Sequence, residues 1–398
     1  MRLIPPPKKI YFMRTAKGFV PLLAGFECST HRTSDGRRLD LVAQTCHDRY
    51  AQHDFARVKQ CGMRTVREGL RWHVIESERG QYDWSSVDTI ILAAQSEGIE
   101  IIWDLLHFGF PDWVNPYHPD FPSIFGDFAE AFSKKVAPAA LYVPINEISF
   151  LSWAAGDVEY MYPWSKGRGG DLKRALCAAA LMATRAIRSV DYNALIIAVE
   201  PMIAVKPFIA PDQVNAQHLH DAQFEAIDML LGNAHADLGG APDMVDVIGV
   251  NHYPHSQWYS DAQRSNIAWK SADWTALSIL LRRVYERYRK PLLLAETGAE
   301  GDMRAHWLNY ITAECQKAQL ANIPIMGICL YPILSHIAWT GERFCPNGLF
   351  DGSQVSRDAD PALLNAVLKY QHITKDISLP IDQNGRPAEQ QGTIFVNA

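Results

Sequence analysis

The sequence predicts an α/β fold, a (β/α)8 TIM barrel that forms a single domain with extended βα loops. Eight short apolar runs recur along the chain, most are followed by an amphipathic helical pattern, and polar residues gather where the runs end. Continuous apolar runs are typical of parallel strands buried on both faces, and eight such strands close a barrel. The runs begin at Val20, Arg64, Glu100, Leu141, Leu195, Val245, Pro291 and Ile325.

The segments between these runs predict helices at 49–60, 87–97, 171–189, 276–289 and 302–320. Asp171 follows a Gly-Gly pair and is the expected N-cap of its helix. Gly62 and Gly98 precede strands and are expected to end helices, as glycines after a helix commonly do. The alternative is an open doubly wound sheet. Such a sheet usually carries a glycine-rich turn after its first strand, whereas here the run from Val20 ends Gly25-Phe-Glu-Cys-Ser.

Length and composition fit one large domain. The chain has 398 residues, 48% of them hydrophobic, with a formal net charge of −6. We expect the barrel at residues 19–370, an N-terminal extension at 1–18, and a C-terminal tail at 371–398 with a short strand at Thr393–Val396. No basic stripe exists to neutralise phosphates, so a nucleic-acid partner is not expected.

Three further features concern the compartment. Lys8 and Lys9 interrupt the apolar run that a signal peptide requires. No stretch reaches the 18 apolar residues typical of a membrane-spanning helix, so no membrane association is expected. The seven cysteines include no C-x-x-C pair. This pattern is typical of reduced thiols and predicts a cytoplasmic protein.

Catalytic residues are expected at the carboxyl ends of the strands, where barrels carry their chemistry. Glu147 and Glu296 each close an apolar run, a position at which a carboxylate is costly unless a partner compensates it. Two such groups facing one barrel mouth raise each other's pKa unequally, which suits one general acid and one nucleophile. The alternative is that each glutamate merely pairs with an arginine. The other polar strand ends are Glu27, Arg67, His107, Asn146, Glu200, Asn251, Tyr253 and Tyr331.

These motifs resemble retaining β-glycosidases of clan A, most closely glycoside hydrolase family 1, over residues 19–351. Asn146-Glu147 is similar to the Asn-Glu pair whose glutamate is the family's acid/base. Ala295-Glu296-Thr-Gly is similar to the motif that holds the nucleophile. The remaining similarities imply that Arg67 lies beside the nucleophile, His107 contacts the glycone, Asn146 reaches the sugar 2-hydroxyl, and Tyr253, in Gly-Val-Asn251-His-Tyr, donates to the nucleophile; Asp48, Tyr50 and Asp54 fit the family's first helix.

The departures from family 1 concern the sugar-binding part. Tyr331 stands where the family has a platform tryptophan, and Ala338 where it has a glutamate that binds the far hydroxyls; Trp339 is kept. Glu27 occupies the end of the first strand, where the family has a glutamine some residues later. Glu342 or Arg343 is the expected compensation for Ala338. The stretch Cys345-Pro-Asn lacks the lysine and tyrosine of the phospho-glycosidases, which disfavours a phosphorylated sugar.

Aromatic residues are abundant in the predicted loops. Sugars pack their C–H faces on aromatic rings, so Trp153, Trp164 and Trp339 are candidate stacking platforms, while Trp269 and Trp274 are better explained as rim packing. His218 and His220 form a metal-like pair without a third ligand, which favours a solvated helix face. His252 and His255 are expected to serve the sugar site. Neither a metal nor another cofactor is needed for the proposed chemistry.

The sequence therefore predicts an enzyme with a carbohydrate substrate, a retaining β-glycoside hydrolase in which Glu296 attacks and Glu147 is the acid/base. Their carboxyl groups are then expected about 5–5.5 Å apart. Two alternatives use the same barrel, namely a transglycosidase of the same mechanism and a carbohydrate-binding pseudoenzyme. An aldolase or a metal-dependent hydrolase ranks last, because no lysine ends a strand and no His-x-His closes the first one.

Overall fold

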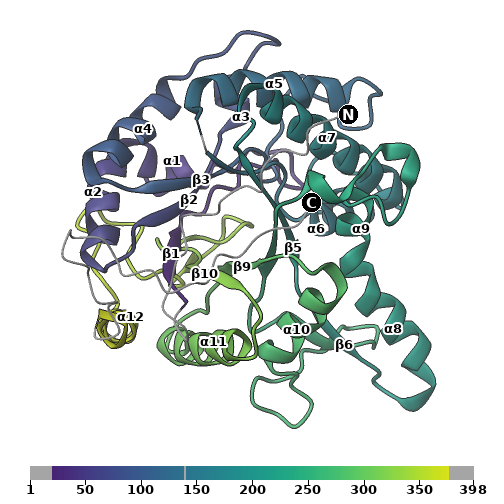
Figure 1. The fold of residues 1–398 in the computed structure, drawn as a ribbon, viewed down its shortest axis with the longest axis vertical. Helices are drawn as coiled ribbons and strands as arrows, with labels where there is room; N and C mark the ends of the chain where they lie inside the picture. The colour runs from purple at the N-terminus through teal and green to yellow at the C-terminus, as the bar shows by residue number, and fades with distance from the viewer. Residues whose placement is uncertain (1–19, 139, 376–398) are drawn as a thin grey trace, which may run out of the picture.

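The computed structural model describes residues 20–138 and 140–375, and these residues form the predicted barrel (Figure 1). Eight parallel strands close in the order β1-β10-β9-β7-β5-β4-β3-β2. Barrel strands that follow one another along the chain are therefore neighbours in the barrel. The (β/α)8 prediction is confirmed. The barrel strands are β1 (Leu22–Gly25), β2 (Thr65–Gly69), β3 (Glu100–Asp104), β4 (Leu141–Val143), β5 (Leu195–Pro201), β7 (Val247–Asn251), β9 (Leu292–Thr297) and β10 (Ile325–Leu330).

Helices surround the barrel on its outside. The five predicted helices are present as α2, α4, α7, α10 and α11. Gly98 ends α4 in the left-handed conformation, as expected. Asp171 is not an N-cap, because α7 begins at Gly169 after Arg168 and Asp171 lies in its first turn. The α-helices are α1 (Leu41–Gln44), α2 (His47–Gln60), α3 (Trp72–Ile75), α4 (Ser85–Glu97), α5 (Phe121–Val136), α6 (Ile148–Gly156), α7 (Gly169–Val190), α8 (Gln213–Asp221), α9 (Glu225–Leu230), α10 (Leu277–Tyr288), α11 (Met303–Leu320) and α12 (Pro361–Lys375).

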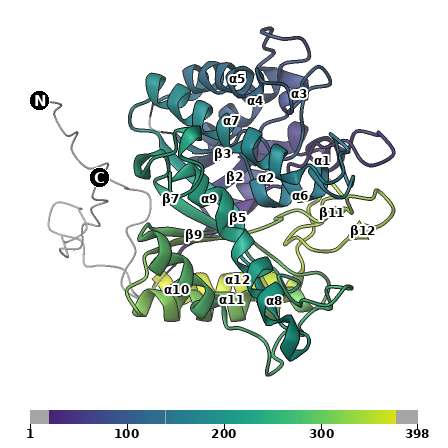
Figure 2. The same cartoon turned by 90° about the vertical axis from the view of Figure 1, so that its right-hand side faces the viewer.

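The long βα loops carry two small sheets. β6 (Ala204–Lys206) pairs in parallel with β8 (Gln257–Tyr259), and β11 (His336–Ile337) pairs antiparallel with β12 (Phe344–Cys345). Figure 2 shows α1, α6 and the β11–β12 hairpin on the same side of the barrel. Because each of these elements follows the end of a barrel strand, this side is the mouth at which the strand ends converge.

Side chains alternate between two cores. Leu23, Ile102, Ile197, Val247 and Leu293 belong to the cluster inside the barrel. The residues next to them in sequence pack outward against the helices, since successive side chains of a strand point to opposite faces. This alternation sets which strand-end residues enter the mouth, except on β9, where a register shift interrupts it.

A buried charged network secures the outer face of β2. His47 on α2 contacts Asp54 through Nδ1 at 2.8 Å and Glu68 through Nε2 at 2.9 Å, and Arg357 donates to Asp54. Burial alone lowers the pKa of His47, but the two carboxylates outweigh it and raise this pKa to about 9. The network therefore ties β2, which carries Arg67, to α2 and to the loop before α12.

Several expectations fall outside the described residues, namely the N-terminal extension 1–18 and the strand at Thr393–Val396. Helix α12 runs to Lys375, so it continues past residue 370, where the barrel was expected to end. No described helix has the length and apolarity needed to cross a bilayer.

Candidate active site

The mouth of the barrel brings Glu296 together with the two donors expected for it. Glu296 lies on β9 and is almost fully buried. Arg67 Nη1 donates to its Oε1 at 2.6 Å, and the Tyr253 hydroxyl donates to its Oε2 at 2.8 Å. Both oxygens therefore accept hydrogen bonds, as those of a carboxylate do.

A β-bulge turns Glu296 into the mouth. Leu292 and Leu294 pack outward, so strict alternation would also send Glu296 outward. Between the pairs Val250–Leu294 and Asn251–Glu296, however, the register of β7 against β9 shifts by one residue. Bulges of this kind re-aim a side chain and are common beside active sites.

Arg67 links Glu296 to the neighbouring strands. Its Nη2 donates to Asp104 Oδ2 at 2.5 Å and to Asn146 Oδ1 at 2.7 Å. Asp104 ends β3, and its Oδ2 also lies 3.0 Å from His107 Nδ1. Asp104 was not predicted, although the sequence signal was present: a carboxylate that closes an apolar run three residues before His107.

Glu147 stands in a different environment. It lies between β4 and α6 with a φ of 46°, in the left-handed region. Asn251 donates to its Oε1 at 2.8 Å, and no cation pairs with Glu147 in the described part of the chain. Desolvation and the charge of Glu296 raise the pKa of Glu147 to about 8. Glu147 therefore carries a proton at neutral pH.

Glu200 is a second carboxyl group that the sequence reasoning left without a role. It follows outward-facing Ala198 on β5, and both its oxygens accept from the Ser149 N–H, at 3.0 and 3.3 Å. Glu200 thus caps α6, the helix that begins directly after Glu147. Burial raises the pKa of Glu200 to about 7. A strand-end glutamate was the available signal, but its helix partner was not visible in the sequence.

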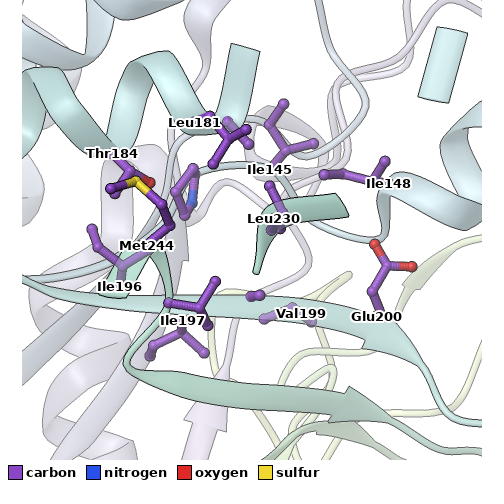
Figure 3. Close-up of a pocket in the computed structure, with 14 residues that line it drawn as sticks. Ile145, Ile148, Leu181, Thr184, Ile196, Ile197, Val199, Glu200, Leu230 and Met244 are labelled. Carbon is purple, nitrogen blue, oxygen red and sulfur yellow. The ribbon is translucent and has the colours of Figure 1, made fainter. Parts of the chain in front are cut away.

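Behind Glu200 lies a small space lined mainly by apolar side chains, among them Ile148, Leu181, Ile196 and Leu230 (Figure 3). Its accessible volume is about 10 Å³, close to the minimum that holds one water molecule. This space is on the outer side of the strands. It has no room for a substrate.

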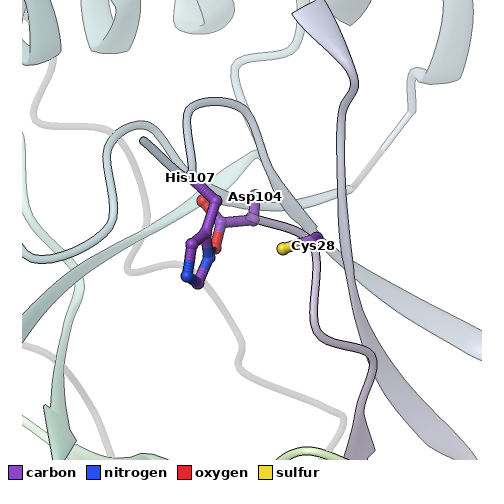
Figure 4. Close-up of side chains that lie close together, drawn as sticks. All are labelled: Cys28, Asp104 and His107. Carbon is purple, nitrogen blue, oxygen red and sulfur yellow. Dashed lines mark hydrogen bonds and ion pairs between the residues drawn. The ribbon is translucent and has the colours of Figure 1, made fainter. Parts of the chain in front are cut away.

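Three potential metal ligands, Cys28, Asp104 and His107, come within 4.8 Å of one another (Figure 4). Asp104 is already bonded to Arg67, and the two ring nitrogens of His107 face Asp104 and Asn146. Burial raises the pKa of the Cys28 thiol to about 11, whereas a metal ligand must be a thiolate. A cation here would also meet the guanidinium. We therefore assign this cluster to the support of Arg67, and it does not fit a metal.

Beside this cluster lies the region expected to hold the glycone. The ring of Tyr331 is stacked parallel to His107 with centroids 6.0 Å apart, and its hydroxyl lies 3.6 Å from Cys28 Sγ. Gly25 is required here, because a Cβ at this position would come within 2.2 Å of the Tyr331 ring. Trp339 packs edge-on against His31 and Phe108. Tyr331, His107 and Trp339 thus lie in one region.

The remaining aromatic predictions divide. Trp153 is partly exposed near the mouth, with Phe150 between it and Trp339. Trp164 Nε1 donates to the Thr33 carbonyl oxygen at 2.9 Å, and this bond holds the indole against the loop that follows β1. Trp269 and Trp274 pack against Trp307, which confirms rim packing.

The histidine predictions also divide. His252 is not a sugar ligand: it alternates with Asn251 and Tyr253, so it points outward, and its Nδ1 lies 2.8 Å from Met202 O. His255 stacks on Tyr253, and its expected service to the sugar site stays a prediction. His218 is exposed on α8, as expected for a solvated face. Neither Glu342 nor Arg343 replaces the missing glutamate, because Glu342 is exposed and Arg343 pairs with Glu300.

The comparisons with known proteins concern the family and the fold. The model of the family Glyco_hydro_42, described as beta-galactosidase, matches residues 40–125. No curated protein matches the chain. The Family 1 b-glucosidase from Thermotoga maritima has a similar structure, with a TM-score of 0.74 and 15% identity over 92% of this chain and 100% of that chain. The beta-glucosidase from Thermotoga maritima in complex with noeuromycin gives a TM-score of 0.73 and 15% identity, over 94% of this chain and 100% of that chain.

At this level of identity the structural likeness establishes the fold alone. The family match covers a part of the chain that includes β2, with Arg67, and β3, with Asp104 and the His107 that follows it. Taken together, the two findings support a clan A glycoside hydrolase barrel, and neither singles out family 1.

Proposed function

We propose that the protein is a retaining β-glycoside hydrolase. One observation carries this proposal: the two glutamates at the mouth have opposite environments. Glu296 receives hydrogen bonds from Arg67 and Tyr253, whereas Glu147 has no cation partner among the described residues and keeps its proton because its pKa is about 8. This pairing of an ionised and a protonated carboxyl group is what double displacement at an anomeric carbon needs.

In the first step Glu296 Oε attacks the anomeric carbon, and the bond to the leaving oxygen breaks. Glu147 gives its proton to that oxygen, so the aglycone leaves as a neutral alcohol. A covalent glycosyl ester of Glu296 remains. Arg67 then stays bonded to Asp104 and Asn146, which hold the guanidinium in position while the charge of Glu296 is lost.

In the second step Glu147, now ionised, takes a proton from water as the water oxygen attacks the anomeric carbon. The ester bond breaks, and Glu296 regains its negative charge. A sugar hydroxyl in place of water makes the same enzyme a transglycosidase. We also propose a cytoplasmic location, because all seven cysteines are free thiols.

Stereochemistry tests the proposal. Hydrolysis of 4-nitrophenyl β-glycosides, followed by proton NMR from the first minutes, is expected to give the β-anomer of the sugar before mutarotation mixes the anomers. An α-anomer as the first product would show inversion and would exclude the Glu296 ester. Saturable binding of these glycosides without release of nitrophenol would favour the pseudoenzyme instead.

The pH profile provides a second prediction. The acid must carry its proton, so kcat/KM is expected to fall as pH rises through about 8, the pKa of Glu147. Glu200 contributes to this raised pKa through its charge.

The variant Glu200→Gln tests this contribution. It keeps an acceptor for the Ser149 N–H and removes the charge, so it is expected to move the alkaline limb to lower pH. The exposed Glu286→Gln on α10 is the matched control. An alkaline limb that stays in place in the Glu200 variant would show that the charge of Glu200 does not contribute to the pKa of Glu147.

A further inference from the structure

Glu27 is a carboxylate inside the barrel mouth that the proposed mechanism does not use. It lies two residues beyond the end of β1, between Phe26, which packs outward, and Cys28, whose Sγ lies 3.6 Å from the Tyr331 hydroxyl in the mouth. Only 8% of the residue is exposed. Its charge contributes to the raised pKa of both Tyr253 and Tyr331. Glu27 therefore lies in the same mouth as the catalytic pair.

One of its two oxygens is free. Oε1 accepts from the Ser29 N–H at 2.8 Å and from the Ser29 hydroxyl at 2.6 Å. Within residues 20–138 and 140–375, Oε2 receives no hydrogen bond and no Lys, Arg or His nitrogen lies within ion-pair distance of the carboxylate. Burial raises the pKa of Glu27, but His107, His336 and the Ser29 bonds outweigh burial and lower it, so the group is ionised. A buried carboxylate with a free oxygen is costly unless a ligand supplies donors.

His31 is a second unsatisfied group in the same region. Its side chain is buried, and its Nδ1 finds no partner among the described residues. Burial lowers the pKa of His31 to about 4, so the ring is neutral and can both donate and accept a hydrogen bond. The ring lies against the edge of Trp339, with centroids 5.2 Å apart. A carboxylate, a neutral imidazole and an indole side by side suit a polyol with one apolar face.

The nearby cations are all committed. Arg67 is bonded to Glu296, Asp104 and Asn146, Arg38 pairs with Asp112, and Arg343 pairs with Glu300. The two histidines that act on Glu27 are engaged as well: the ring nitrogens of His107 face Asp104 and Asn146, and those of His336 face Ile337 O and Asn347. A carboxylate or phosphate on the glycone would meet Glu27 without a free cation from the described part of the chain to compensate it. The arrangement therefore selects against acidic sugars.

We propose that Glu27 binds hydroxyl groups of a neutral glycone through its free oxygen, and that it makes the enzyme reject uronic and phosphorylated sugars. This inference rests on the proposed function, since it assumes that the glycone occupies the mouth beside Glu296. The Glu27 carboxylate then takes the place of the hydroxyl-binding glutamate that family 1 has at the position of Ala338. Glu27 is a specificity residue that acts on the substrate directly.

The test compares wild-type protein with Glu27→Gln and with the exposed control Glu286→Gln, on 4-nitrophenyl β-D-glucoside, β-D-galactoside and β-D-glucuronide. Glu27→Gln is expected to lower kcat/KM for the neutral glycosides roughly 10- to 100-fold, the effect of losing a hydrogen bond to a charged group. The control is expected to leave it unchanged. With a deoxy-glycoside that lacks the bound hydroxyl, wild type and Glu27→Gln should differ less than twofold.

Two outcomes overturn the proposal: equal kcat/KM in wild type and Glu27→Gln on the neutral glycosides, or faster wild-type cleavage of the glucuronide. Thermal unfolding of the Gln variant, and of Glu27→Asp as the charge-preserving variant, checks that the fold is kept. Calorimetric binding of methyl β-glycosides separates the two proposals. If the wild-type protein binds the glycosides without turnover and Glu27→Gln abolishes this binding, the hydrolase proposal is refuted and the binding role of Glu27 is supported. If the protein turns the glycosides over and Glu27→Gln does not change the rate, the hydrolase proposal is supported and the role of Glu27 is refuted.

Discussion

Glu296→Gln is expected to abolish turnover, with kcat falling by at least ~10⁴-fold, a loss typical of removing a covalent nucleophile. The amide has a similar size and keeps one acceptor oxygen for Arg67 or Tyr253, so the mouth should stay in place. What it loses is the negative charge that attacks the anomeric carbon and then leaves again. The measurement is release of 2,4-dinitrophenol from activated β-glycosides, where leaving-group departure needs no acid.

Two controls make this result specific. Thermal unfolding should show a melting temperature within a few degrees of wild type, since Arg67 keeps Asp104 and Asn146 as acceptors. Glu296→Gly leaves space for azide, and its expected product with added azide is the α-glycosyl azide, formed by attack on the face that Glu296 has vacated. Substantial activity in the folded Gln variant would exclude Glu296 as the nucleophile.

The bulge on β9 shows where sequence reasoning reaches its limit. The eight apolar runs were sufficient to predict the barrel, because strands buried on both faces leave a continuous hydrophobic signal. The same continuity hides which residues face inward. Counted by strict alternation from Leu293, Glu296 points outward, and only the register shift against β7 turns it into the mouth. Its position was predicted from its place at a strand end.

The residues that were missed or misjudged have a common cause. Asp104 and Glu200 act through partners far along the chain, Arg67 on β2 and Ser149 on α6. The sequence shows each carboxylate at a strand end but does not show its partner. His252 was misjudged for the related reason that its neighbours Asn251 and Tyr253 are site residues, while alternation places His252 on the opposite face. The misjudged N-cap at Asp171 has a separate, local cause, because α7 starts at Gly169, two residues before it.

Glu147→Gln is expected to divide substrates by their leaving group. An alkyl β-glycoside needs a proton on the departing oxygen, so its kcat/KM should fall by ~10²- to 10⁴-fold, the usual contribution of a general acid. A 2,4-dinitrophenyl glycoside needs no proton, so glycosylation of Glu296 should remain fast. The missing base then slows attack by water, and the glycosyl ester should accumulate. A burst of dinitrophenol followed by slow turnover is the expected measurement.

The raised pKa of Glu147 links this result to the pH profile. Gln has no proton to lose near pH 8, so the alkaline limb of kcat/KM that wild type shows with alkyl glycosides should disappear in the variant. Added azide needs no base, and with Glu147→Ala, which leaves space beside Asn251, it should restore turnover and give the β-glycosyl azide. An equal slowing of alkyl and dinitrophenyl glycosides would contradict the acid/base role. It would leave Glu147 with a binding role only, because a proton donor must matter more as the leaving group becomes more basic.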